Sequence, residues 1–206
     1  MIAVIDYKMG NHGSIMNVLK KIGVQAIISA DPKEIEKADK LILPGVGSFD
    51  SGMKNLNDLG LLTVLNEMVL QKGTPIMGIC LGMQLFSRGS EEGTLPGLCW
   101  IDAQAVRFKF NNEQNSRLRI PHMGWNMVEV TQGSPLFHEM YPEPRFYFVH
   151  SYHLSCKDEK NILTRTFYGY SFISSVISGN VVGVQFHPEK SHKFGLKLMK
   201  NFVELF

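Results

Sequence analysis

The sequence predicts a doubly wound α/β fold, with a mostly parallel sheet in the first half of the chain and an antiparallel strand region added in the second half. Two observations predict it. Up to about residue 90, short apolar runs alternate strictly with helical patterns, which is typical of a parallel sheet covered by helices on both faces. Beyond that point the apolar segments are short, aromatic-rich and separated by Gly, Pro and Asn, as in antiparallel strands.

The elements of the first half follow from the spacing of apolar residues. Strand candidates are short β-branched runs such as IAVI, and helix candidates repeat apolar residues every three or four positions. A glycine closes the first helical pattern, as at many helix ends. We expect strands at 2–5, 24–28, 40–45 and 75–79, a helix at 14–22, one or two helices over 55–73, and another helix beginning near residue 81.

The second half closes with an amphipathic helix after a series of short strands. The helix covers KFGLKLMKNFVELF, and Ser191 is its expected cap. No repeat, low-complexity tract or linker separates the two halves, so we expect residues 1–206 to form a single domain. The expected strands, attached to the same sheet, lie within 98–110, 125–130, 145–154, 161–169, 172–179 and 181–186.

Composition excludes several classes of function. The 206 residues are 44% hydrophobic and 19% charged, which is ordinary for a globular protein and too apolar for a disordered one. A formal net charge of +2 gives no general attraction to nucleic acid or membrane, and no stretch approaches the roughly 18 apolar residues of a membrane helix. We therefore expect the protein to bind neither nucleic acid nor a membrane.

The three cysteines are Cys80, Cys99 and Cys156, an odd number without a CxxC pair. This pattern favours a reducing compartment and predicts no metal or redox site. No signal-peptide core opens the sequence, so the cytoplasm is the expected location.

Cys80 lies where a predicted strand turns into a helix, within GICLG. Glycines two residues before and after a nucleophile allow the close approach of strand and helix in the G-x-S-x-G elbow. A helix N-terminus would also favour the thiolate over the thiol. A buried core thiol is the alternative, and the two glycines alone leave both interpretations open.

His187 is the candidate base for such a nucleophile. It follows an apolar run in VVGVQFHPEKS, and Glu189 stands two positions later. Side chains at i and i+2 of an extended chain point the same way, and Pro188 is expected to keep this link extended, so Glu189 is placed to bond one ring nitrogen. Taken alone, a histidine is more often structural, but Cys80, His187 and Glu189 together form a complete set of nucleophile, base and acid.

A third segment, LPGVGSFDSG at residues 43–52, follows the third expected strand. Glycines in such a turn let successive backbone N–H groups point outward and bind an anion, such as a tetrahedral oxyanion. An ordinary strand-to-helix turn remains the alternative. No G-K-[ST] follows, so we expect no nucleotide site.

Three of these segments, PGVGSF, GICLGMQ and QFHPEKS, in this order, closely resemble class I glutamine amidotransferases. IAVIDYKMGN, IPHMGWN, FYFVHSYH and GNVVGVQFHPEKSHKFG resemble one branch of that family, the HisH-type glutaminase subunits of imidazole glycerol phosphate synthase. The resemblance covers essentially the whole chain. It implies a flavodoxin-like sheet, no cofactor and no metal.

The resemblance also implies a mechanism. Cys80 would attack the side-chain amide of L-glutamine, form a glutamyl thioester and release ammonia. His187 would protonate the leaving amine and then activate water, while Glu189 orients the imidazolium. The implied oxyanion hole is formed by the backbone N–H groups of Leu81 and of the Val46–Gly47 segment. The implied substrate residues are Gln84, Ser151 and Tyr152.

A single domain of this size leaves no second catalytic domain to use the ammonia, so we expect a partner. In the family it is a HisF-like (βα)₈-barrel synthase subunit that forms a heterodimer with the glutaminase and makes imidazole glycerol phosphate for histidine synthesis. The resemblance places partner-interface or signalling positions at Asn11, Trp125, His150 and Lys190. For Trp125 a core position, and for Lys190 a solvated charge, are the alternatives.

The sequence departs from the family at Lys8, where most members have glycine. The segment lies where a partner could be selected. A HisH-like subunit that supplies ammonia to a sugar-aminating enzyme of surface glycan synthesis therefore stays open as an alternative. Two further alternatives are a cysteine hydrolase that works alone and a catalytically silent regulatory subunit.

Overall fold

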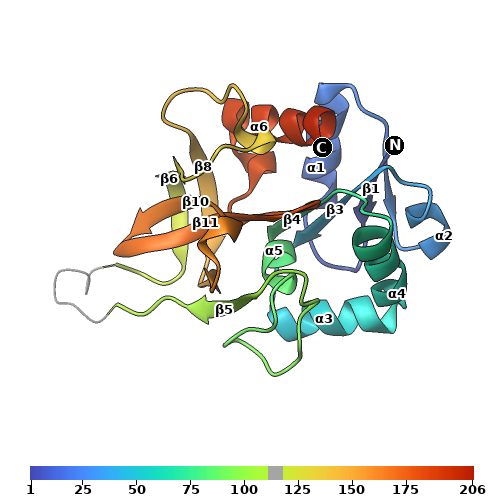
Figure 1. Ribbon diagram of the computed structural model, residues 1–206, viewed down its shortest axis with the longest axis horizontal. Helices are drawn as coiled ribbons and strands as arrows, with labels where there is room; N and C mark the ends of the chain where they lie inside the picture. Colours follow the sequence, from blue (N-terminus) through green and yellow to red (C-terminus); the bar gives the residue numbers. More distant parts are fainter. Residues whose placement is uncertain (111–117) are drawn as a thin grey trace.

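The computed structural model describes residues 1–110 and 118–206 (Figure 1). Five strands form its parallel part, in the spatial order β2-β1-β3-β4-β12. Counted along the chain this is the 2-1-3-4-5 order of flavodoxin-like folds, and it agrees with the predicted α/β class. The strands are β1 (Ile2–Ile5), β2 (Ala26–Ser29), β3 (Lys40–Gly45), β4 (Ile76–Cys80) and β12 (Val181–Val184).

Helices cover both faces of this sheet (Figure 1). One face is covered by α1 (His12–Ile22) and α6 (His192–Leu205), and the apolar side chains between them form one core cluster. The other face packs the second cluster against α2 (Pro32–Ile35), α3 (Phe49–Asp58), α4 (Leu61–Asn66), the π-helical turn Glu67–Gln71 and α5 (Leu81–Leu85). None of the helices in the described residues is long and apolar enough to cross a bilayer.

The helical region expected at 55–73 begins earlier than predicted, at Phe49. The carboxylate of Glu92 accepts a hydrogen bond of 2.8 Å from the Phe49 backbone N–H and so satisfies one of the free donors of the helix start. Glu92 is 43 positions away, and for this reason no local pattern indicated the start. Gly60, with φ 68°, separates α3 from α4.

The antiparallel region continues the sheet beyond β12. β11 (Tyr170–Ser178) pairs with β12, β10 (Ile162–Tyr168) pairs with β11, and β7 (Glu129–Val130) pairs with β10. A branch of the sheet consists of β9 (Tyr152–Cys156), which pairs with β11, and β5 (Ala103–Arg107), which pairs with β9. β12 is antiparallel to β11, as predicted, but it also pairs in parallel with β4, which was not expected. The prediction that all strands of this half join the main sheet was wrong, because β6 (His122–Met127) and β8 (Arg145–His150) form a separate two-stranded ribbon.

The single strand expected over 145–154 is divided at Ser151 into β8 and β9. Each half pairs with a different strand, β8 with β6 and β9 with β5 and β11. The break therefore follows from partners distant in sequence, because nothing within this uniformly aromatic segment marks Ser151 as a boundary.

Candidate active site

Cys80 and the His187 segment meet at the carboxyl edge of the parallel sheet. Cys80 is the last residue of β4, and His187 lies three residues beyond the end of β12. The two strands are parallel neighbours in the register Ile79 to Val184, which sets Cys80 beside Gln185. On its other side Cys80 pairs with Gly45 of β3. The ends of parallel strands meet at one edge, where ligands bind in open α/β sheets.

The backbone of Cys80 is strained. Its φ of 55° and ψ of −110° lie outside the regions that side-chain-bearing residues favour, as expected for a nucleophile on a sharp strand-to-helix turn. The two flanking glycines make the turn possible. A Cβ at Gly78 would lie 2.5 Å from the Phe86 ring, and one at Gly82 would lie 1.9 Å from the carbonyl oxygen of Leu43.

His187 and Glu189 form a buried pair. Nδ1 of His187 lies 2.8 Å from Oε1 of Glu189, and the two side chains are 2% and 1% exposed. Burial lowers the pKa of His187, but attraction to Cys80 and then to Glu189 outweighs burial and raises it to about 10. Nε2 is buried without a hydrogen bond to any described residue, and since Nδ1 is bonded to Glu189, Nε2 is the nitrogen left for the Cys80 thiol.

The route by which Glu189 reaches His187 differs from the prediction. Residues Pro188–Lys190 form a 3-10 turn instead of an extended link. Ser191 holds this turn in place: its hydroxyl donates to the carbonyl of His187 at 2.6 Å and accepts from the backbone N–H of Tyr147 at 3.0 Å. Ser191 is the N-cap residue of α6, as predicted, but its side chain makes no cap hydrogen bond to the helix.

A cavity of about 390 Å³ opens beside Cys80. Val46 and Gly47 come from the loop after β3, where Gly47 adopts φ 114°, and Leu81 is the first residue of α5. The structure thus brings every residue predicted for the oxyanion hole and the substrate to one cavity. It is lined by Val46, Gly47, Cys80, Leu81, Gln84, Glu92, Pro121, Val149, His150, Ser151 and Tyr152.

Two side-chain amides form a chain under the cavity. Nε2 of Gln84 donates to the backbone carbonyl of Tyr152 at 3.0 Å and to Oε1 of Gln185 at 3.1 Å. Nε2 of Gln185 in turn donates to Sγ of Cys80 at 3.7 Å. Sequence analysis missed Gln185, although a polar residue inside the apolar run VVGVQF was the available signal.

A second chain connects the cavity wall with the β6–β8 ribbon. Nδ1 of His150 lies 2.8 Å from the Tyr152 carbonyl, which can only accept, so this nitrogen carries the proton and Nε2 of His150 accepts from Nδ1 of His122 at 3.0 Å. Asn126 then donates to Nε2 of His122 at 3.2 Å. Burial lowers the pKa of His122 to about 4 and that of His150 well below its usual value. Sequence analysis missed His122 and Asn126.

The other residues predicted for an interface lie outside the cavity. Trp125 is 44% exposed and stacks on the ring of His192, so it is on the surface and not in the core. Nζ of Lys190 lies 5.7 Å from the centre of the Tyr147 ring. The side-chain oxygen Oδ1 of Asn11 accepts from the Ser14 backbone N–H, so Asn11 caps α1.

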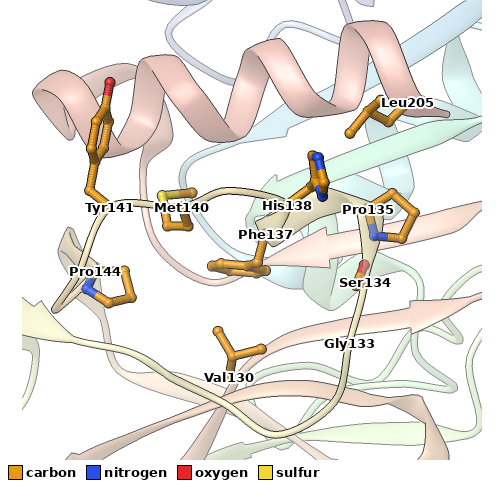
Figure 2. Close-up of a pocket in the computed structure, with 10 residues that line it drawn as sticks. All are labelled: Val130, Gly133, Ser134, Pro135, Phe137, His138, Met140, Tyr141, Pro144 and Leu205. Atoms are coloured by element: carbon orange, nitrogen blue, oxygen red, sulfur yellow. The ribbon is translucent and has the colours of Figure 1, made fainter.

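A larger cavity of about 860 Å³ shares no lining residue with the first (Figure 2). It lies beneath the end of α6 and is mainly apolar, with side chains such as Phe137, Met140 and Pro144. Within residues 1–110 and 118–206, no group of three His, Cys, Asp or Glu side chains is arranged to hold a metal ion.

Known proteins resemble the chain over its whole length. Residues 3–205 match the family model "Glutamine amidotransferase class-I". An imidazole glycerol phosphate synthase subunit HisH 2 from Methanococcus maripaludis is 57% identical over 99% of both chains, and one from Pseudomonas aeruginosa is 50% identical over 100% of both. A crystal structure of a glutamine amidotransferase superposes with a TM-score of 0.72 at 21% identity, covering 99% of this chain and 97% of the other, which supports the fold.

Proposed function

The chain belongs to the class I glutamine amidotransferase family, and from this premise we propose that it is the glutaminase subunit of an imidazole glycerol phosphate synthase. It hydrolyses L-glutamine to glutamate and ammonia, and a partner subunit uses the ammonia in histidine synthesis. One observation carries the catalytic part of the proposal: Cys80 stands in a strained turn at the wall of a cavity, beside the buried pair of His187 and Glu189.

In the proposed reaction, Sγ of Cys80 attacks the carboxamide carbon of glutamine while His187 holds the thiol proton on Nε2. When the tetrahedral intermediate collapses, the C–N bond breaks and His187 gives this proton to the leaving ammonia. His187 then takes a proton from water, which attacks the thioester carbonyl, and the C–S bond breaks. Glu189 keeps the imidazolium oriented and its charge balanced, a form of acid–base help typically worth about 10² to 10⁴-fold.

The oxyanion of both intermediates is placed against the turn after β4 and the loop after β3. As the first residue of α5, Leu81 has a backbone N–H without an intrahelical acceptor. The Val46–Gly47 segment lines the same cavity and supplies the opposite N–H. Losing one such donor typically costs about 10² to 10³ in kcat.

The amino-acid end of glutamine is assigned to Gln84 and the Ser151–Tyr152 segment. Both hydrogens of the Gln84 amide nitrogen are already bonded, to Tyr152 and to Gln185, so its carbonyl oxygen is the group that faces substrate. That oxygen accepts from the α-ammonium group of glutamine, and the backbone at Ser151–Tyr152 holds the other side of the ligand.

The exposed face of the β6–β8 ribbon is the proposed docking surface for a (βα)₈-barrel partner of the HisF type. Along β6, Met123, Trp125 and Met127 point outward and are 62%, 44% and 50% exposed. Alternate positions carry His122 and Asn126, which connect to the cavity. A heterodimer is proposed on this basis, and the cytoplasm is its proposed location.

The test measures ammonia and glutamate released from glutamine by the purified chain together with the barrel subunit of the same organism. Cys80→Ala is expected to abolish release, whereas Cys99→Ala, which changes an exposed thiol, is expected to leave it unchanged. Equal release by the wild type and Cys80→Ala would refute the nucleophile. Release that yields no imidazole glycerol phosphate with that partner, but aminates a sugar with another, would replace the histidine pathway with glycan synthesis.

A further inference from the structure

We propose that Gln185 is a further catalytic residue, whose side-chain amide donates a hydrogen bond to the Cys80 sulfur and stabilises its thiolate. The proposal rests on the proposed function of Cys80 as nucleophile. Nε2 of Gln185 lies 3.7 Å from Sγ and donates to it, while the thiol itself lies 3.9 Å from the backbone carbonyl oxygen of Val149. Its side chain is fully buried, so water cannot compete for the amide.

The backbone carbonyl of Tyr152 determines the orientation of the Gln185 amide, through the side chain of Gln84. The Tyr152 carbonyl only accepts, so the atom of Gln84 that lies 3.0 Å from it is the nitrogen. The same nitrogen lies 3.1 Å from the Gln185 amide, whose facing atom must therefore be the oxygen. The nitrogen of Gln185 is then left to face Cys80, because a rotated Gln185 amide would set nitrogen against the Gln84 nitrogen and oxygen against the Cys80 sulfur.

The neutral amide of Gln185 acts at the step in which the Cys80 sulfur leaves the thioester as a thiolate. In hydrolysis of the thioester, water adds to the carbonyl, the C–S bond breaks, and its electron pair goes to sulfur. The leaving thiolate accepts the hydrogen bond of Gln185 until the proton returns from His187. A thioester sulfur is a weaker acceptor than a thiolate, so the donor stabilises the charged form more than the acylated form.

Several ionisable groups also face Cys80 and stay unchanged in the test. The imidazole of His187 approaches from the segment after β12, with Glu189 behind it. The Tyr7 hydroxyl lies buried on the β1 side, where burial and then the charge of Cys80 raise its pKa. His150 and Glu92 belong to the cavity wall.

The experiment follows alkylation of Cys80 by iodoacetamide as a function of pH, with peptide-resolved mass spectrometry to separate it from the other cysteines. Gln185→Met removes the donor but keeps the length of the side chain. The backbone N–H of residue 185 still bonds to Ser174, so the strand contact survives. Gln185→Asn, one methylene shorter, withdraws the amide from sulfur and serves if the Met variant does not fold. Gln104→Met makes the same chemical change at an exposed position of β5 and is the control.

Two increases are expected in Gln185→Met, one in the midpoint pH of alkylation and one in its plateau rate constant. A hydrogen bond to a charged group is lost, so the pH of half-maximal alkylation rises by about one to two units. Above that pH the freed thiolate is more nucleophilic, and the plateau rate constant rises about 2.5- to 10-fold. A variant that only disturbs the packing around Cys80 is not expected to raise both the midpoint pH and the plateau rate constant. An unchanged midpoint and plateau in both Gln185 variants would overturn the proposal.

This outcome is separable from the proposed function. Alkylation needs neither glutamine nor a partner, so a chain that fails to hydrolyse glutamine still gives the titration. If the wild type and Gln104→Met release ammonia normally while both Gln185 variants keep the wild-type alkylation profile, only the role of Gln185 is refuted.

Discussion

Gly82 is the residue whose replacement tests the strand-to-helix elbow most directly. A Cβ at this position would lie 1.9 Å from the carbonyl oxygen and 2.9 Å from the carbonyl carbon of Leu43. Both are backbone atoms of β3 and cannot turn away, while an ordinary C···O contact is about 3.3 Å or longer. Gly82→Ala must therefore push α5 away from β3 by more than about 1 Å, which moves Cys80 relative to His187.

Overpacking of this kind typically costs about 1 to 3 kcal/mol, and for a protein of this size each kcal/mol lowers Tm by about 2 to 4 °C. We expect Gly82→Ala to melt roughly 2 to 12 °C below the wild type in thermal denaturation followed by circular dichroism. Displacement of the nucleophile by about 1 Å is expected to lower kcat of glutamine hydrolysis about 10²-fold.

Gly13→Ala is the matched control, because a Cβ at Gly13 meets no atom within 4 Å. It lies in the first turn of α1 and is expected to leave Tm and kcat unchanged or to raise Tm slightly. If Gly82→Ala has the same Tm as Gly13→Ala and retains full glutaminase activity, the elbow does not need the close approach of α5 to β3, and the reasoning is refuted.

The remaining predictions concern charge, pH and the docking surface. Glu189→Gln keeps the shape of the pair but removes the charge beside His187, so kcat with the partner present should fall about 10² to 10⁴-fold with little change in KM; a loss below twofold would contradict the assigned role. His122 has a pKa of about 4 in the folded protein against an ordinary 6.5, so the unfolded chain binds more protons between these values. The free energy of unfolding in urea should therefore fall as pH drops from 6.5 to 4, by up to about 3 kcal/mol from this residue, and His122→Phe should flatten the dependence. Trp125→Ala should weaken partner binding in calorimetry by about tenfold or more, whereas Leu70→Ala, an exposed apolar residue of the π-helical turn, should not.

The sequence alone predicted the first four strands of the parallel sheet and the turn that carries Cys80. Each depends on residues close in the chain: apolar runs bury strands, and glycines two residues before and after Cys80 permit the tight turn. The backbone conformation at Lys8 is also a local feature. Lys8 has a left-handed φ of 65°, a backbone conformation that glycine adopts more readily than other residues.

The tertiary structure decided which side chains meet. Gln185 contacts Cys80 only because β12 pairs in parallel with β4, 105 positions away in sequence. Glu92, 43 positions from Phe49, bonds the start of α3. The strands β6 and β8 form a separate ribbon because they pair with each other and not with a strand of the main sheet. Local patterns specify backbone conformation through short-range sterics and burial. The environment of the nucleophile arises from strand pairing between distant segments, which no short window of sequence contains.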